Sequence, residues 1–282
     1  MKTLCRGYYT GERALFASEN LRICEGTFAD GESPLKESKN LQIENCLFKW
    51  KYPLWYCQNV KVSGSTFFDT ARAGIWYTEN IAFRDGVIEA PKTFRRSKGI
   101  TLERVTLPNA AETLWNCEDV TLKSVTANGT YFGMNCKNVT CEDFVLTGDY
   151  CFDGAENVTI KNAKLLSKDS FWNSKNVTVY DSFISGEYLG WNAENLTLVG
   201  CTIESLQGLC YIKNVKLMNC RLVNTTLAFE YSTVDAQILG AVDSVLNPSG
   251  GRITAERIGK LIIEPDRVDP KKTIIRCTED EQ

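Results

Sequence analysis

Most tryptophans of the chain stand at one equivalent position of a repeated phrase, and their type and spacing suit carbohydrate binding. They are five of the six tryptophans present: Trp55, Trp76, Trp115, Trp172 and Trp191. Three of them are followed directly by an amide: Asn116, Asn173 and Asn192. Sugar rings stack on exposed aromatic faces, and amides supply the hydrogen bonds that orient them. An outward-facing Trp column therefore predicts a linear platform for an extended ligand, such as a polysaccharide or an oligosaccharide.

The opposite interpretation places the same Trp column in the core. In an unbroken strand, the Trp position shares its face with a mostly small residue two positions later, which favours burial. However, the column also contains Arg95 and Asp153. Unpaired charges inside a narrow lumen are costly, so these two residues favour the surface. The sequence alone leaves both interpretations open.

Three residues are candidates for catalysis: Arg95, Arg96 and Asp153. A lyase that works without calcium needs a basic side chain to take a proton, and a glycoside hydrolase needs two carboxyl groups about 5–9.5 Å apart. The chain has no histidine and no Asp-Asp or Asp-x-Asp pair. We therefore expect no metal and no cofactor. A carbohydrate-active enzyme, a lyase or a glycoside hydrolase, remains an alternative to a binding protein.

The element that positions these residues is a short repeat. A phrase of a polar residue, an Asn and an apolar–polar–apolar triplet recurs eleven times, at intervals of 19 to 21 residues from Asn20 to Asn214, with Gly99 and Asp119 in place of the Asn in two repeats. A fixed period of this size predicts a solenoid with one coil per repeat. The triplet predicts a strand with one buried face, and a turn and a second strand follow it. A third apolar segment, such as residues 170–172, predicts a third strand in each coil.

Neither a five-residue nor a six-residue apolar period survives a full coil, which leaves a right-handed parallel β-helix. The Asn-Val-Thr phrases and the Trp-Asn pairs resemble the pectin-lyase-like superfamily. More closely, they resemble bacterial proteins of unknown function with this short coil. The resemblance covers about residues 18–265 and implies an all-β, single-stranded right-handed parallel β-helix with coils of about 19 residues. The best-known members of the superfamily are polysaccharide lyases, polygalacturonases and pectin methylesterases.

The repeat contains no linker, so we expect one domain over residues 1–282. Regular coils are predicted over residues 18–223 and irregular final coils over residues 224–265. A cap over residues 1–17 and a tail over residues 266–282 are expected to cover the open ends.

The composition of the chain argues against some classes of partner. The chain has 32 basic and 35 acidic residues and no basic run longer than a pair, which argues against nucleic acid. It has no 18-residue apolar run and no apolar core behind Met1–Gly7. We therefore expect a cytoplasmic protein that does not span a membrane. The oligomeric state is open, and a scaffold that binds another protein is a third functional hypothesis.

Equivalent positions of successive coils should stack about 4.8 Å apart as columns. The Asn column is expected to bond one coil to the next. The residue before each Asn position alternates between Glu and Lys, apart from Gln58. The alternation includes Lys98, which precedes Gly99 at an Asn position. We expect this charge column to fix the register of the coils. The twelve cysteines are expected to be free thiols, most of them buried.

Overall fold

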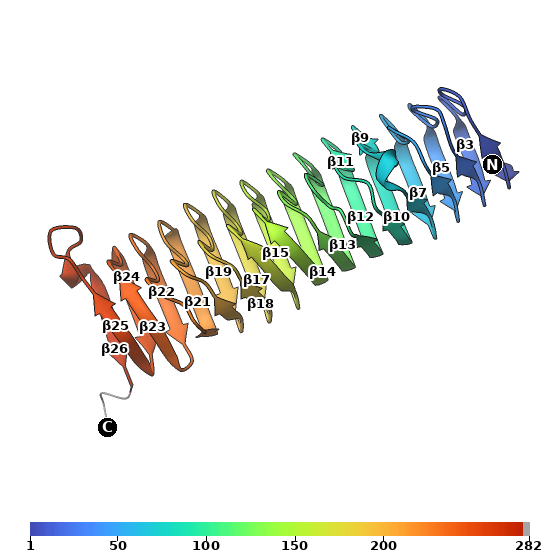
Figure 1. The fold of residues 1–282 in the computed structure, drawn as a ribbon. Coiled ribbons are helices and arrows are strands. Elements are labelled where there is room, and N and C mark those ends of the chain that lie inside the picture. Colours follow the sequence, from blue (N-terminus) through green and yellow to red (C-terminus); the bar gives the residue numbers. More distant parts are fainter. Residues whose placement is uncertain (279–282) are drawn as a thin grey trace. The chain divides into compact units, whose positions relative to one another are not determined.

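The computed structural model describes residues 1–278. Two compact units make up the chain: one spans Met1–Leu146, and the other begins at Thr147. Each unit is a stack of parallel β coils (Figure 1). Helical structure in the described residues is limited to two 3₁₀ turns, η1 (Asp69–Ala71) and η2 (Pro270–Lys272), so no helix there is long enough to cross a membrane. The predicted all-β parallel β-helix is confirmed.

Two sides of the first unit are parallel sheets. One side contains, in spatial order, β1 (Lys2–Cys5), β3 (Glu19–Cys24), β5 (Lys39–Glu44), β7 (Gln58–Ser63), β10 (Glu79–Ile88), β12 (Lys98–Leu107) and β13 (Glu118–Asn128). The other side contains β2 (Tyr8–Tyr9), β4 (Thr27–Phe28), β6 (Leu47–Phe48), β8 (Thr66–Phe67) and the end of β10. Strand β14 (Lys137–Asp149) runs from this unit into the next.

The second unit repeats this arrangement. Its first side contains β15 (Glu156–Lys161), β17 (Lys175–Tyr180), β19 (Glu194–Val199), β21 (Lys213–Leu222), β22 (Thr233–Ile238), β24 (Gly250–Ala255) and β26 (Thr273–Cys277). Its second side contains β16 (Lys164–Lys168), β18 (Phe183–Ser185), β20 (Thr202–Glu204) and the end of β21. Strands β23 (Ala241–Leu246) and β25 (Arg257–Ile262) pair with each other.

The register aligns the apolar positions of successive coils in the core. Leu21 pairs with Leu41, and Leu41 pairs with Val60. The eighth position after the Asn is buried in every repeat. Near the N-terminus it forms a ladder of rings, in which the Phe28 and Phe48 centroids are 4.6 Å apart and the rings are parallel within 2°. Aromatic and aliphatic burial of this kind supplies the main stabilisation of each coil.

The Asn column forms a corner with left-handed backbone. Asn59 has φ of 55°, and the two residues that interrupt the column, Gly99 and Asp119, have φ of 68° and 55°. Gly, Asn and Asp are the residue types that adopt this conformation most readily. The side chains also bond between coils, as predicted, because the Asn59 amide donates to Asn40 Oδ1 at 3.0 Å.

The predicted third strand is wrong in most coils. Within residues 1–278, the strands on this side are β9 (Ile75–Trp76) and β11 (Phe94–Arg95). Elsewhere alternate residues are left-handed, for example Asp169, Phe171 and Asn173 with φ of 56°, 61° and 53°. Extended strand backbone has negative φ, so left-handed residues at every second position wind this segment through turns.

The charge column is stacked as predicted within each unit. In the first unit, Glu79 pairs in register with Lys98, which pairs with Glu118. The Lys98 Nζ lies 3.4 Å from a Glu118 carboxylate oxygen. In the second unit, Lys175 is in register with Glu156 on one side and Glu194 on the other. Opposite charges therefore face each other between coils.

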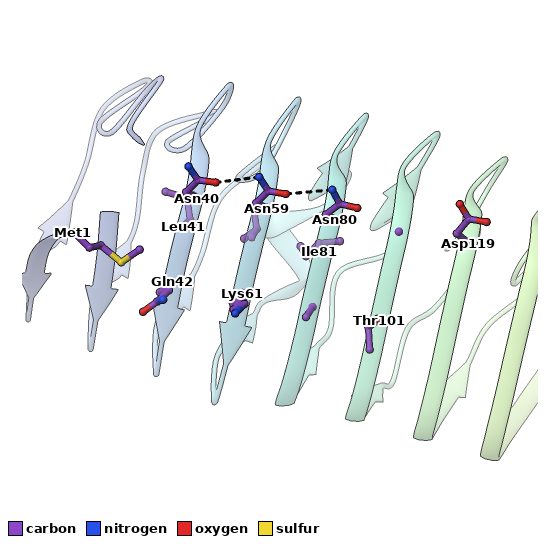
Figure 2. A pocket seen from close by; sticks show the side chains of 13 residues that line it. Met1, Asn40, Leu41, Gln42, Asn59, Lys61, Asn80, Ile81, Thr101 and Asp119 are labelled. Carbon is purple, nitrogen blue, oxygen red and sulfur yellow. Dashed lines mark hydrogen bonds between the residues drawn. The ribbon is translucent and has the colours of Figure 1, made fainter. Parts of the chain in front are cut away.

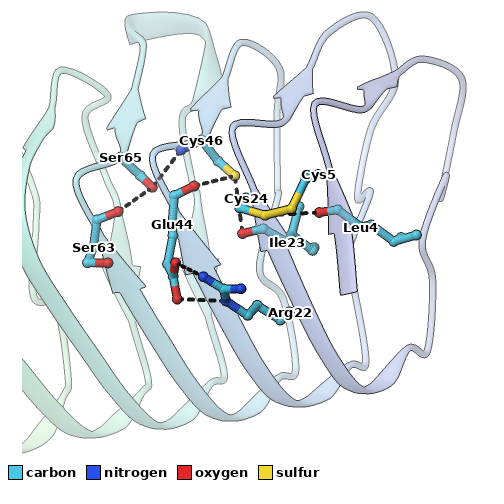
Figure 3. Close-up of polar contacts among 9 residues, drawn as sticks. All are labelled: Leu4, Cys5, Arg22, Ile23, Cys24, Glu44, Cys46, Ser63 and Ser65. Carbon is cyan, nitrogen blue, oxygen red and sulfur yellow. Dashed lines mark hydrogen bonds and ion pairs between the residues drawn. A yellow bond between two sulfur atoms is a disulfide. The ribbon is translucent and has the colours of Figure 1, made fainter. Parts of the chain in front are cut away.

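The expectation of twelve free thiols is corrected to ten, because Cys5 and Cys24 form a disulfide (Figure 3). Residues 2–5 were expected in a cap, but they form β1 in register with β3, which places the two cysteines side by side. Nine of the remaining cysteines are buried. Burial raises the pKa of the Cys57 thiol to about 12, which makes it unreactive.

Polar contacts between the first coils are shown in the same view. Arg22 binds both carboxylate oxygens of Glu44, at 3.1 and 2.6 Å (Figure 3). The buried Ser65 hydroxyl accepts the Cys46 N–H at 3.0 Å and donates to the Ser63 carbonyl at 3.0 Å. Cys46 and Ser65 occupy the same position of successive repeats, where both side chains are small and both satisfy backbone groups. Of the predicted tail, residues 279–282 lie outside the described residues.

Candidate functional site

The Trp column lies at the surface of both units. All five tryptophans are half-buried, whereas the residue before each of them is buried. The residue after each is left-handed, for example Asn116 with φ of 52° and Asn173 with φ of 53°. This conformation breaks the strand alternation on which the core interpretation depended. The indoles therefore do not share a face with the buried small residues, and the core interpretation is wrong.

In the first unit the column is a continuous stack. The Trp55 and Trp76 rings are parallel within 6°, with centroids 5.1 Å apart. The Arg95 guanidinium carbon lies 4.7 Å from the Trp76 centroid and 4.5 Å from the Trp115 centroid. Arg95 thus occupies the place of a ring between two indoles, where its charge interacts favourably with both π faces. Its Nη2 also lies 3.2 Å from Glu112 Oε2.

The contacts of Arg95 and Asp153 argue against the catalytic roles that the sequence suggested for them. A guanidinium keeps its proton in proteins, and that of Arg95 is held by two rings and a carboxylate. Arg96 is exposed at a left-handed corner with φ of 48°. Asp153 belongs to the second unit, where it accepts a hydrogen bond of 3.0 Å from Asn173 Nδ2. Arg95 and Asp153 are each engaged by side chains of the following coil, which suits structural roles.

The indole N–H groups are used within the fold. Trp76 Nε1 donates to the Lys92 carbonyl at 2.8 Å, and Trp115 Nε1 donates to the Tyr131 carbonyl at 3.0 Å. Trp172 Nε1 donates to the Tyr188 carbonyl at 2.9 Å. Each of these bonds reaches a carbonyl on the following coil, so the rings are fixed before any ligand arrives. What they offer to a ligand is their exposed apolar surface.

The amides beside the Trp column form a second ladder. In the second unit, Asn192 Nδ2 donates to Asn173 Oδ1 at 2.8 Å, and Asn173 donates in turn to Asp153. In the first unit, the exposed Asn116 takes the same left-handed corner. All three candidate amides are therefore corner residues, and those of Asn173 and Asn192 also connect coils.

Two hollows open beside the Trp column, and both arise where a short side chain interrupts a neighbouring column. This Tyr column stands seven residues before each Asn position and reads Tyr52, Ala73, Lys92, Glu112, Tyr131, Tyr150, Asp169, Tyr188 and Gln207. In the first unit, a hollow of about 330 Å³ lies over Ala73, between Tyr52 and Lys92 and against Trp55 and Trp76. We call it the first-unit hollow.

The second-unit hollow, of about 430 Å³, lies over Asp169. It is lined by Tyr150, Lys168, Asp169, Trp172, Tyr188, Trp191 and Gln207. The Tyr150 and Trp172 rings meet at 88° with centroids 5.6 Å apart, and the Tyr188 and Trp191 rings meet at 87° at 5.8 Å. Asp169 is only 2% exposed. Its Oδ1 has no hydrogen-bond partner among the described residues, and burial raises the pKa of this carboxyl.

The sequence interpretation missed Tyr150, Asp169 and Tyr188. The available signal was the Tyr column itself, in which Asp169 stands between two tyrosines. A short acidic residue in that place predicts both a missing ring and a carboxylate beneath the gap.

A larger hollow of about 600 Å³ follows the Asn column of the first unit. Figure 2 shows Asn40, Asn59 and Asn80 in a row along it, with each amide bonded to its neighbour. The small residues Ala82 and Gly99 give it depth. Its amides are occupied by the ladder and it has no aromatic ring, so its chemistry is weaker than that of the Trp column.

Comparison with known proteins places the chain in a family. The model of the family DUF3737, described as a protein of unknown function, matches residues 2–276. The chain belongs to this family. None of the curated proteins matches it.

Solved structures with a similar fold are β-helix proteins. The surface adhesin PfbA of Streptococcus pneumoniae is 10% identical, with 93% of this chain and 83% of that chain covered and a TM-score of 0.43. The tailspike protein of Escherichia coli bacteriophage HK620, solved in complex with a pentasaccharide, is 8% identical, with 97% and 72% covered and a TM-score of 0.43. An exopolygalacturonase from Thermotoga maritima is 10% identical, with 97% and 83% covered and a TM-score of 0.33. These likenesses concern the fold and carry no functional argument.

The two hollows of this family member differ in charge. The first-unit hollow has the basic residues Arg72 and Lys92 at its rim, and Lys92 Nζ lies 3.2 Å from Glu112. In the second-unit hollow, Lys168 is the basic residue, and its Nζ lies 3.3 Å from Glu187. Asp169 remains there as a buried acidic group that forms no ion pair with any residue in 1–278. The two hollows therefore favour ligand groups of different charge.

Proposed function

We propose that the protein binds a carbohydrate along its Trp column, with the two hollows as the principal contact points, and that it does so without catalysis. The observation that carries this proposal is the half-buried aromatic column at the surface, which runs beside hydrogen-bonding groups in each unit. Carbohydrate sites combine apolar ring contact with a few oriented polar groups. An extended glycan would contact several coils of one unit.

The rigidity of the column supports binding. Indoles that are bonded to the following coil lose little rotamer freedom when a ligand arrives, which lowers the entropic cost of association. In the first unit the ring faces are largely covered by one another and by Arg95. Ligand contact is therefore concentrated in the hollows, rather than on a series of open faces.

The test is a glycan array followed by affinity electrophoresis with the glycans that bind. Trp76→Ala and Trp172→Ala remove one indole from each hollow, and we expect each to weaken binding about tenfold or more. Trp50→Ala is the matched control, because Trp50 is the half-buried tryptophan outside the column. Equal binding by all three variants, or no bound glycan on the array, would contradict the proposal.

A further inference from the structure

Asp169 is the least expected group in the second-unit hollow. A carboxylate that is 98% buried normally has partners for both oxygens, because burial without a partner is costly. Here Oδ1 has none among the described residues, although the Tyr150 side chain hydrogen-bonds to the carboxyl group, and Asp169 lines the hollow. The fold therefore keeps an acceptor beneath an open space.

The walls above this acceptor are aromatic. Tyr150 and Tyr188 belong to the Tyr column on either side of Asp169. At about 4.8 Å per coil they lie roughly 10 Å apart, which is room for one inserted group. Trp172 and Trp191 complete the walls, with centroids 6.1 Å apart and planes 31° from parallel. Tyr150 and Trp172 are nearly perpendicular, as are Tyr188 and Trp191.

Four aromatic rings around a carboxylate favour a cation. Ring faces carry negative quadrupole density, and aromatic cages of this kind bind ammonium groups. The other charged groups that interact with Asp169 are Asp149, Lys168 and Glu187. Lys168 lies against Glu187 and over the Tyr188 ring, 5.5 Å from its centroid, so its charge is already balanced. The surroundings are thus net acidic and disfavour an anionic ligand.

We propose that the second-unit hollow binds the ammonium group of a carbohydrate, such as an amino sugar or a choline-bearing glycan, with Asp169 as its counter-ion. The rings of Tyr150, Trp172, Tyr188 and Trp191 enclose the cation. This inference rests on the proposed function, because it names the ligand class for part of the same column.

The first experiment compares ligands that differ only in charge. The full chain is titrated by calorimetry with choline and with its neutral analogue 3,3-dimethylbutanol, and then with glucosamine and N-acetylglucosamine. We expect the charged member of at least one pair to bind about tenfold or more tightly than its neutral counterpart. The pair that responds distinguishes a trimethylammonium from an amino-sugar ligand. Equal affinities within both pairs, or no binding by either cation, would overturn the inference.

The second experiment tests the residue. Asp169→Asn is expected to weaken binding of the cation about tenfold or more while leaving the neutral analogue unaffected. Asp181→Asn is the control, since it removes an exposed carboxylate of the same unit that does not line the hollow. Asp169→Tyr restores the Tyr column, and we expect it to fill the hollow and abolish binding. Circular dichroism melts confirm that each variant is folded. Undiminished cation binding by Asp169→Asn would refute the role of the carboxylate.

The two proposals can fail separately. Glycan binding that is lost in Trp76→Ala but unchanged in Asp169→Tyr would support the proposed function and overturn the ammonium site. Conversely, charge-selective binding at Asp169 without any glycan on the array would support the ammonium site as a small-molecule site and overturn the proposed function.

Discussion

Asp169 shows how one residue converts a structural repeat into a candidate site. Its neighbours in the Tyr column fill the same position with rings, and its short side chain leaves the space of one ring empty. Its φ of 56° is no obstacle, because Asp tolerates the left-handed region. The cost is a buried carboxylate with an unpaired oxygen. Local features that reduce stability in this way are typical of binding sites.

The pH dependence of the unfolding free energy tests whether burial of the Asp169 carboxylate reduces stability. The pKa of Asp169 is raised in the folded protein by burial, so the folded state binds the proton more tightly than the unfolded state. Its stabilising contribution is complete below the unfolded pKa of about 3.9 and is lost as the pH rises through the raised folded pKa. We expect Asp169→Asn to be more stable than the parent chain at neutral pH, by about 1–2 kcal/mol.

The measurement is urea unfolding of the parent chain and Asp169→Asn between about pH 4 and neutrality. The difference in unfolding free energy between them should shrink as the pH falls, because the carboxyl of the parent chain becomes protonated. Asp181→Asn controls for the removal of an exposed carboxylate. A difference between the parent chain and Asp169→Asn that stays constant with pH would show that Asp169 does not titrate as argued.

At the scale of the element, the third side of each coil decides where the tryptophans point. The sequence pattern there, such as Ser170-Phe171-Trp172, has the apolar character of a strand. Asn173, with φ of 53°, instead turns the chain directly after the indole. Phe171 is consequently buried, and Trp172 lies half-buried at the surface. The Asn that follows the Trp is the sequence signal for this turn. An Asn marks the corner in the Asn column in the same way.

Neighbouring residues of one coil allow a direct comparison of core and surface rings. Phe171→Ala removes a fully buried ring, and we expect it to cost about 3–5 kcal/mol of unfolding free energy. Trp172→Ala removes a half-buried ring, and we expect about half of that cost or less. Denaturant unfolding of both variants provides the values. A cost for Trp172→Ala equal to that for Phe171→Ala would place the indole in the core and weaken the carbohydrate proposal.

At the scale of the whole chain, the repeat made the fold predictable. The second-unit hollow was not predicted, because it lies where one residue departs from the repeat. Strands, core positions and register follow from columns that recur in every coil, because identical neighbours impose identical contacts. The second-unit hollow depends on the departure at Asp169 between two tyrosines, and a periodic pattern does not show one such position. The disulfide was missed because Leu4-Cys5 was not aligned with Ile23-Cys24, although these segments are in register.

The last prediction concerns the charge column, which runs through successive coils of each unit and so affects the stack rather than one contact. Lys175 faces Glu156 and Glu194 in the register of the second unit. Lys175→Glu would place three acidic groups in succession, and like charges directly opposite each other are destabilising. We expect a loss of at most about 1 kcal/mol of unfolding free energy, because Lys175 and Glu194 are exposed and Glu156 is only partly buried.

The loss should also shrink with salt, since the Debye length falls from about 10 Å at 0.1 M to about 3 Å at 1 M. Lys164→Glu is the matched control, because it makes the same charge change opposite Phe183 rather than opposite a carboxylate. Unfolding of both variants at low and high salt isolates the effect of stacking. If Lys175→Glu and Lys164→Glu respond alike to salt, the alternating charges do not contribute to the register, and the apolar columns alone must align the coils.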